Sequence, residues 1–107
     1  MKYIKKKLTI DKIKIEDIAK KFSTPTYCYS YTQLKKNISN FKKNFKSFSP
    51  LICFAIKSNT NLNLIKEIQK FGLGADVVSM GELMMALKAG IIQKKLFFQV
   101  WAKHRKR

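Results

Sequence analysis

The chain of 107 residues is 46% apolar and carries 23 Lys and Arg against 6 Asp and Glu, a net charge of +17. This composition supports one modest core, so we expect one domain or part of one. The apolar runs fall far short of the ~20 residues of a membrane span and the start has no apolar signal core, which exclude membrane-spanning and secreted classes and favour a cytoplasmic protein.

The first half of the chain predicts two helices around one short strand. The first helix ends near Phe22, because Pro25 disfavours helix in the residue before it. Residues 26–30 are short, aromatic and typical of a strand. A strongly amphipathic helix follows, and Ser30 or Thr32 can cap its start. The apolar positions of this second helix are Leu34, Ile38, Phe41, Phe45 and Phe48.

The second half predicts three strands that alternate with two helices. The continuous apolar run that ends at Lys57 is typical of a strand covered on both faces of a parallel sheet. Gly72 and Gly90 are placed to end the two helices, and Ser79 and Glu82 have the spacing of a capping box at the start of the second one. The predicted strands are 51–57, 74–79 and 96–100, and the helices span 61–71 and 79–90.

Alternation of strands and helices predicts an α/β fold with a parallel sheet. Four strands cannot close an eight-stranded barrel, so the pattern leaves open a small open sheet and the first part of a barrel. The two cysteines, Cys28 and Cys53, lie in apolar strand-like runs without the spacing of a zinc site. We therefore expect two buried free thiols and no metal site.

Lys57 is the candidate of greatest chemical interest. The two-residue period of a strand places it on one face with Cys53 and Ala55, and the small side chain of Ala55 leaves room beside it. It also lies at the carboxyl end of a strand, where α/β proteins assemble their sites. A lysine amine held partly out of water there becomes a nucleophile able to form a Schiff base. On spacing alone, an ordinary surface lysine is the more frequent outcome.

Two acids near the next strand have structural explanations as well. Asp76 can be an acid at a strand end that balances nearby lysines. Glu82 can be only the reciprocal half of the capping box that Ser79 begins. Without further information, these structural roles are the more frequent ones for such positions.

Three blocks of sequence, in order, resemble the diaminopimelate decarboxylase family of pyridoxal-phosphate-dependent enzymes. The blocks are FSTPTYCYS at 22–30, ICFAIKSN at 52–59 and GADVVSMGEL at 74–83. The resemblance implies a partial (β/α) TIM-type barrel, alanine-racemase-like, of about the first four strands, without the carboxyl-terminal β domain of the family. It also implies that Lys57 bears pyridoxal 5'-phosphate, with Asp76, Ala55 and Glu82 at the same pocket. Met80 departs from the glycine usual in the family.

The resemblance further implies a reaction and partners. A small-molecule amino-acid substrate, meso-diaminopimelate, would lose carbon dioxide to give L-lysine, with most of the catalytic power supplied by the cofactor. The family forms homodimers, and its phosphate loop and substrate arginines lie further along the chain. We therefore expect this piece alone to be inactive. Another decarboxylase or racemase of the same family is the alternative, because the residues that select the substrate lie downstream.

The last residues predict a change of character. Residues 1–98 read as the amino-terminal part of the pyridoxal-phosphate-binding barrel domain, and residues 99–107 as a basic, out-of-frame tail. The single Trp, the single His and both Arg of the chain all fall in 101–107. A shifted reading frame near Phe98 would restore a pattern typical of the family, a hypothesis that the coding DNA tests.

The charge of +17 also fits a small basic nucleic-acid-binding protein. Almost all of this charge is lysine, whereas surfaces that read bases favour arginine, here only Arg105 and Arg107. Charge by itself indicates non-specific association and not a fold. We therefore expect a solvated, lysine-rich surface and no specific nucleic acid or membrane partner, with nucleic-acid binding kept as the competing hypothesis.

Overall fold

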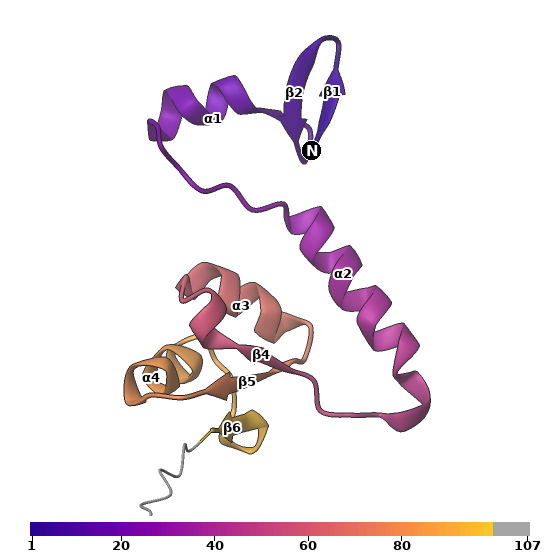
Figure 1. The fold of residues 1–107 in the computed structure, drawn as a ribbon, viewed down its shortest axis with the longest axis vertical. Coiled ribbons are helices and arrows are strands. Elements are labelled where there is room, and N and C mark those ends of the chain that lie inside the picture. Colours follow the sequence, from indigo (N-terminus) through magenta and orange to yellow (C-terminus); the bar gives the residue numbers. More distant parts are fainter. Residues whose placement is uncertain (100–107) are drawn as a thin grey trace, which may run out of the picture. The chain divides into compact units, whose positions relative to one another are not determined.

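The computed structural model describes residues 1–99, which fall into two units that divide after Phe45 (Figure 1). The first unit contains three short strands and two helices. These are β1 (Lys2–Ile4), β2 (Lys7–Ile10), β3 (Ile13–Lys14), α1 (Ile15–Phe22) and α2 (Tyr31–Asn44). The predicted tail at 99–107 lies outside the described residues, apart from Gln99.

The strands β1, β2 and β3 form an antiparallel sheet that the sequence did not predict. Its two tight turns place Lys5 and Lys6, and then Asp11 and Lys12, at positive φ. Hairpin turns of this kind usually carry Asn or Gly at those positions. The sequence lacks that signal, which explains why the hairpins were missed.

In the first unit, two predictions about helix ends are confirmed, and two predictions about residues 26–30 are wrong. Helix α1 ends at Phe22 as predicted, and α2 begins where the Ser30 hydroxyl accepts the backbone N–H of Gln33 at 3.0 Å. Residues 26–30, predicted as a strand, are irregular, and Cys28 is exposed, so the prediction of a buried thiol is wrong there. No described strand pairs with residues 26–30, so this strand-like sequence does not form a strand.

The second unit is an α/β unit around a parallel sheet with the strand order β4-β5-β6. The predicted strands at 51–57, 74–79 and 96–100 are all found, but shorter, and the last predicted position, Val100, lies outside the described residues. Its elements are η1 (Lys46–Phe48), β4 (Cys53–Ala55), η2 (Ile56–Ser58), α3 (Leu62–Lys70), β5 (Gly74–Val77), α4 (Met80–Lys88), η3 (Gln93–Lys95) and β6 (Leu96–Phe98).

Side-chain caps define the starts of the two helices between the strands, the predicted one at Ser79 and a second one at Asn61 that was not predicted. The Asn61 side chain accepts the N–H groups of Asn63 and Leu64 at the start of α3, and Ser79 accepts the N–H of Glu82 at the start of α4. Gly72 and Gly90 follow the helices at φ values of 81° and 94°, which only glycine adopts without strain. Both helix ends are therefore where the sequence placed them.

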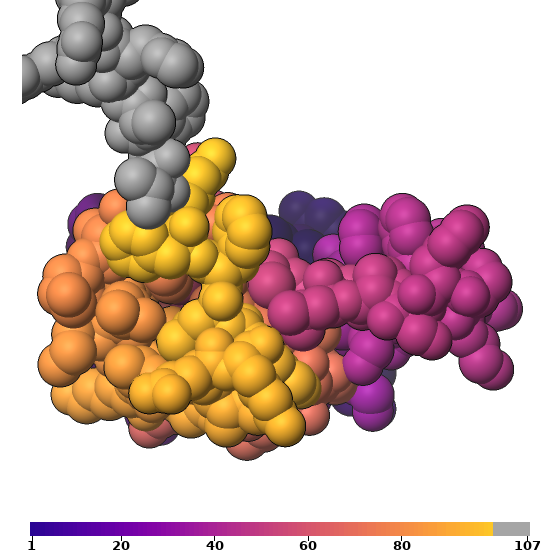
Figure 2. Space-filling model, turned by 90° about the horizontal axis from the view of Figure 1, so that it is seen from below, coloured from indigo at the N-terminus to yellow at the C-terminus, as the bar shows by residue number. Residues whose placement is uncertain are grey.

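The core lies on one face of the parallel sheet. Register pairs Phe54 with Ala75 and Ala75 with Leu96, and this face packs against residues of α3 and α4. The buried cluster contains Ile56, Ile65, Ala75, Val77, Ala86, Ala89 and Ile91. All three residues of β4 are only half-buried, so the prediction of a strand covered on both faces is not met within the described residues. The orange and yellow segments after residue 80 form a broad surface of this unit in Figure 2.

Candidate cofactor site

The candidate site lies on the sheet face opposite the core, at the carboxyl ends of β4 and β5. Register pairs Cys53 with Gly74, Ala55 with Asp76, and Asp76 with Phe97. Because directly paired residues of parallel strands share a face, these five side-chain positions form one surface, here called the open face. Three of the five residues, Ala55, Gly74 and Cys53, are small.

Lys57 lies two residues beyond Ala55, in the short turn η2 that continues β4. The sequence predicted a partly desolvated lysine on the strand itself. In the structure the strand ends at Ala55, and Lys57 is exposed. The difference has a physical reason, because β4 pairs over only three residues and the chain enters the short turn η2 at Ile56, before Lys57. The role of Lys57 as the cofactor lysine stays a prediction.

Asp76 is the second candidate, and its carboxylate is incompletely satisfied. Its Oδ1 atom is buried and has no hydrogen-bond partner among the described residues. A buried polar atom without a partner carries a cost in free energy, so such atoms in native proteins call for an explanation, often an absent ion, water or ligand. The Oδ1 atom is ready to accept a hydrogen bond from a donor group on the open face.

Cys53 lies one strand away from Asp76 on the same face. Burial raises the pKa of the Cys53 thiol, and the negative charge of Asp76 raises it further. The thiol is half-buried and free, so the prediction of a free cysteine is confirmed at this position while full burial is not. Both effects favour the protonated thiol over the thiolate, which is the nucleophilic form. Cys53 thus forms one side of the open face.

Gly74, the first residue of β5, lies very close to the neighbouring residues Cys53 and Lys95. A Cβ atom added to Gly74 would lie 2.9 Å from the Cys53 Sγ atom and closer still to the backbone carbonyl oxygen of Lys95. Only glycine therefore fits at this position. No local pattern singles out Gly74, because the constraint comes from residues 21 positions away on either side, which the fold brings together.

Glu82 is engaged in the helix cap. Its Oε2 atom accepts the backbone N–H of Val78 at 2.9 Å, while its own N–H is bonded to the Ser79 hydroxyl at 3.2 Å. The predicted capping box is thus present, with the carboxylate bonded one residue before the cap residue. This arrangement holds the β5–α4 loop in place. Glu82 thus has a structural role in the described chain, and the place of Glu82 in a cofactor pocket stays a prediction.

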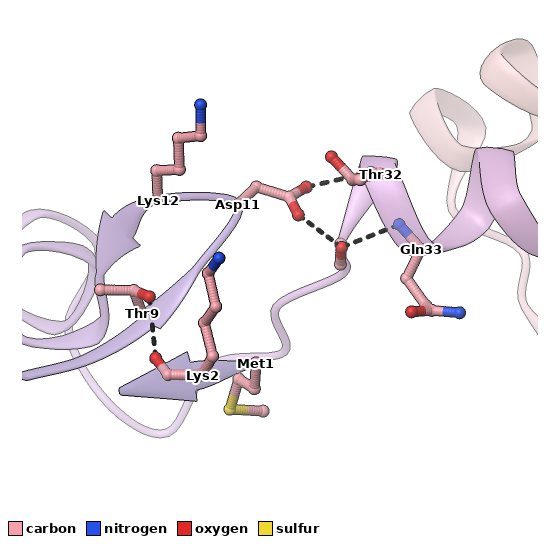
Figure 3. Close-up of a pocket in the computed structure, with 8 residues that line it drawn as sticks. Met1, Lys2, Thr9, Asp11, Lys12, Thr32 and Gln33 are labelled. Atoms are coloured by element: carbon pink, nitrogen blue, oxygen red, sulfur yellow. Dashed lines mark hydrogen bonds between the residues drawn. The ribbon is translucent and has the colours of Figure 1, made fainter. Parts of the chain in front are cut away.

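A second hollow lies in the first unit and uses none of the predicted site residues (Figure 3). The Asp11 carboxylate accepts the Ser30 hydroxyl at 2.6 Å and the Thr32 backbone N–H at 3.1 Å. The bond with Ser30, followed by the bond with Thr32, lowers the pKa of Asp11. The carboxylate accepts these hydrogen bonds at the start of α2, so it acts as a cap of that helix. The hollow is lined by Met1, Lys2, Thr9, Asp11, Lys12, Ser30, Thr32 and Gln33.

The residues of the open face fit pyridoxal phosphate better than a metal ion. In the described part of the chain, no three His, Cys, Asp or Glu side chains gather as a metal site requires. No helix described there has the length and apolar character to cross a bilayer. A cofactor with an aldehyde and polar ring groups needs an amine to hold it, open space beside the strand and an acceptor for its donors. Ala55 and the unpaired Oδ1 of Asp76 on the open face, with Lys57 in the adjoining turn η2, are the residues that would meet these needs.

Comparisons with known proteins agree with this chemistry. A family model described as the pyridoxal-binding domain of pyridoxal-dependent decarboxylases matches residues 31–107. Diaminopimelate decarboxylase from Helicobacter pylori is 41% identical over 83 residues, which are 78% of this chain and 20% of that protein.

Two crystal structures have the same fold over most of the chain. A protein from Aquifex aeolicus superposes with a TM-score of 0.88 at 36% identity, over 95% of this chain and 25% of its own. Diaminopimelate decarboxylase from M. jannaschii, in a complex with L-lysine, superposes with a TM-score of 0.86 at 33% identity, over 91% of this chain and 24% of its own. The chain thus spans a fifth to a quarter of the length of these relatives.

Proposed function

The chain belongs to the pyridoxal-dependent decarboxylases, of whose pyridoxal-binding domain it contains a part, and we propose that it provides the cofactor lysine of a diaminopimelate decarboxylase. The proposed reaction converts meso-diaminopimelate to L-lysine and carbon dioxide. Two features of the relatives support this substrate: the Helicobacter pylori protein carries that name, and the M. jannaschii protein of the same name has been crystallised with L-lysine.

One observation carries the proposal for Lys57 in particular. Ala55 and Asp76 are register partners, so the turn that bears Lys57 leaves β4 next to the strand end that bears Asp76. The amine and the unpaired Oδ1 atom are therefore presented by neighbouring strand ends. Carboxyl ends of parallel strands are where α/β folds assemble catalytic groups.

The proposed roles follow from the chemistry of each side chain. Bound pyridoxal phosphate supplies an electron sink for the bond that breaks when carbon dioxide leaves. The Lys57 amine holds the cofactor and, once free, can carry a proton. Ala55 keeps space for a ring beside the strand. The Asp76 carboxylate accepts a hydrogen bond from a donor in the pocket, and Glu82 fixes the loop between β5 and α4 through Val78.

The proposal assigns residues 1–98 to the pyridoxal-binding barrel domain and residues 99–107 to a tail of different origin. Most of that tail lies outside the described residues, so the DNA hypothesis stays a prediction. An intact, unshifted gene that stops naturally after Arg107 would contradict it. A cytoplasmic location is proposed on the same family grounds, together with absence of activity in this chain alone. The homodimer is a property of the family and is not proposed for this chain.

Reductive labelling tests the role of Lys57. The purified chain is incubated with pyridoxal phosphate, treated with borohydride and digested, and the modified lysines are found by mass spectrometry. We expect Lys57 to be modified at low cofactor concentration, ahead of the other lysines. The matched control is Lys66→Ala on the exposed face of α3, which should leave the labelling of Lys57 unchanged, whereas Lys57→Ala should abolish the preferred label.

Labelling spread evenly over the lysines would contradict the proposal, because it would show that no amine is favoured by its surroundings. The competing nucleic-acid hypothesis makes a different prediction. It requires salt-sensitive binding to DNA or RNA and no preferred label on Lys57. Substrate choice within the family is tested separately, with meso-diaminopimelate against other amino acids in an assembly that contains the rest of the domain.

A further inference from the structure

The turn η2, which carries Lys57, is tied back to the strand before it. The hydroxyl of Ser58 donates to the Ala55 carbonyl at 2.7 Å. The backbone N–H of Asn59 donates to the Ile56 carbonyl at 3.1 Å. Serine hydroxyls readily form such bonds to a carbonyl three residues earlier in the chain. These two bonds, here called the Lys57 clasp, close the backbone of residues 55–59 into a turn with Lys57 at its centre.

The core holds the chain just before Lys57. Ile56 is fully buried in the core cluster, together with Val77 of β5 and Ala86 of α4. The next two residues, Lys57 and Ser58, are exposed. Because Ile56 cannot leave the core without exposing an apolar side chain to water, the backbone on that side of Lys57 is fixed. The conformation of the turn beyond Ile56 then depends on the bonds of the Lys57 clasp.

On the other side, the Lys57 clasp continues into the start of α3. The side-chain oxygen of Asn59 accepts the backbone N–H of Asn61 at 2.9 Å. The Asn61 side chain in turn accepts the N–H groups of Asn63 and Leu64, which makes it the cap of α3. Local hydrogen bonds therefore connect the end of β4 to the start of α3, and Lys57 lies between these two elements.

The Ser58 hydroxyl has no part in the helix caps around it. The turn η2 follows Ala55 without a side-chain cap, and the cap of α3 comes from Asn61. Ser58 is exposed, so its hydroxyl can exchange the bond to the Ala55 carbonyl for one to water, and the bond adds little to global stability. Its effect is local, because it restricts the backbone conformations that the turn can adopt.

We propose that Ser58 is a positioning residue, which acts through the Ala55 carbonyl to hold the Lys57 amine next to the strand end that bears Asp76. This inference rests on the proposed role of Lys57 as the cofactor lysine. The amine sits on a flexible stem of four carbons, so its position depends on how firmly the backbone below it is held. A group that is ordered before binding loses less conformational freedom on binding. The Ser58 hydroxyl thus favours cofactor binding through the backbone of the turn.

Reductive labelling of three variants of the full chain tests the role of Ser58. In Ser58→Ala, half-maximal labelling of Lys57 by pyridoxal phosphate and borohydride should need at least about threefold more cofactor, as expected for the loss of one hydrogen bond. Ser58→Thr keeps a hydroxyl that can form the same bond, and it should label like the unmodified chain. Ser79→Ala removes the cap of α4 in the same unit and should also label like the unmodified chain, although it is less stable.

Hydrogen exchange gives a second readout that needs no cofactor. In Ser58→Ala, the Asn59 amide should exchange at least about threefold faster, because the turn opens more often. The Ala89 amide, bonded to the Met85 carbonyl in α4, should be unchanged.

The outcomes separate the role of Ser58 from that of Lys57. Unchanged labelling or unchanged Asn59 exchange in Ser58→Ala would overturn the role of Ser58 and leave Lys57 as the cofactor lysine. The same conclusion would follow if Ser58→Thr or Ser79→Ala lost labelling as Ser58→Ala does. An unmodified chain in which Lys57 is labelled no more readily than the other lysines would overturn the proposed function, and the role of Ser58 with it.

Discussion

Ala55 and Asp76 are direct partners across the parallel strands β4 and β5, on the sheet face opposite the core. The pairing sets a methyl group beside a carboxylate whose Oδ1 atom is buried and unpaired. The arrangement combines a small side chain with an unused hydrogen-bond acceptor, a combination more typical of a ligand site than of a packed core.

The unpaired oxygen makes a stability prediction for Asp76. Replacing Asp76 with alanine removes an acceptor that has no partner, so the chain should lose little stability or gain up to about 1 kcal/mol. Urea unfolding of the two proteins measures the difference. Asp76→Asn, which keeps the shape, is the control and should gain less. A loss of about 1 kcal/mol or more on Asp76→Ala would show that the oxygen has a partner in solution.

The thiol of Cys53 reports on the charge of Asp76. Burial is the larger cause of its raised pKa and the carboxylate the smaller one. The variant Asp76→Asn should therefore lower the pKa of Cys53 towards its ordinary value without restoring it. At a fixed mildly alkaline pH, more thiolate forms, and alkylation by iodoacetamide should be faster. The exposed Cys28 serves as the internal control, and an unchanged rate ratio would contradict the influence of Asp76.

The close approach at Gly74 predicts opposite effects at two glycines. Gly74→Ala places a Cβ against the Lys95 carbonyl oxygen, which cannot move without breaking the β5–β6 pairing. We expect a loss of about 1–3 kcal/mol or more in the free energy of unfolding. Gly81→Ala is the control, because its Cβ would meet nothing nearer than the Ser79 Oγ at 3.9 Å. It lies in α4 and should stabilise the chain by up to about 1 kcal/mol.

Much of the second unit could be predicted because its signals are local. The caps Asn61 and Ser79 and the glycines Gly72 and Gly90 fix the ends of α3 and α4 through contacts within four residues. Apolar runs located all three parallel strands. The predicted strands were too long because an apolar run shows which residues can be buried, whereas the length of a strand depends on pairing with a neighbouring strand. The strand β4 pairs over three residues only.

The first unit and the fine structure of the site depend on contacts that no local pattern reveals. The turns at Lys5 and Asp11 adopt positive φ without glycine or asparagine, so the hairpins left no signature. The cap that Asp11 gives to α2 comes from about 20 residues away. The exposure of Lys57 could not be read from the apolar run either, because the run continues through Ile56 whereas the strand ends at Ala55 and Lys57 lies in the turn η2.

The Asp11 cap makes the first unit sensitive to acid. Hydrogen bonds from Ser30 and then Thr32 lower the pKa of the carboxylate, so the folded state favours the charged form. Its contribution to stability is complete above the ordinary carboxyl range and is lost as the pH falls through the lowered pKa. The Thr32 amide should titrate by NMR with a midpoint below that of an ordinary aspartate. Asp11→Asn should remove this titration, and a midpoint at the ordinary value would contradict the cap.

Glu82 offers a way to separate a structural role from a functional one. Its carboxylate accepts the Val78 N–H, and the amide oxygen of glutamine can accept the same bond. Glu82→Gln should therefore change the free energy of unfolding by less than about 0.5 kcal/mol, whereas Ser79→Ala, which removes the other half of the cap, should cost about 1 kcal/mol.

The same two variants differ in what they do to the cofactor. If the charge of Glu82 contributes to the pocket, Glu82→Gln weakens the borohydride labelling of Lys57 in an assembly that contains the rest of the domain, although the helix cap is intact. Ser79→Ala then loses stability but keeps the preferred label. Equal labelling by Glu82→Gln and the unmodified chain would confine Glu82 to the cap that Val78 and Ser79 already define.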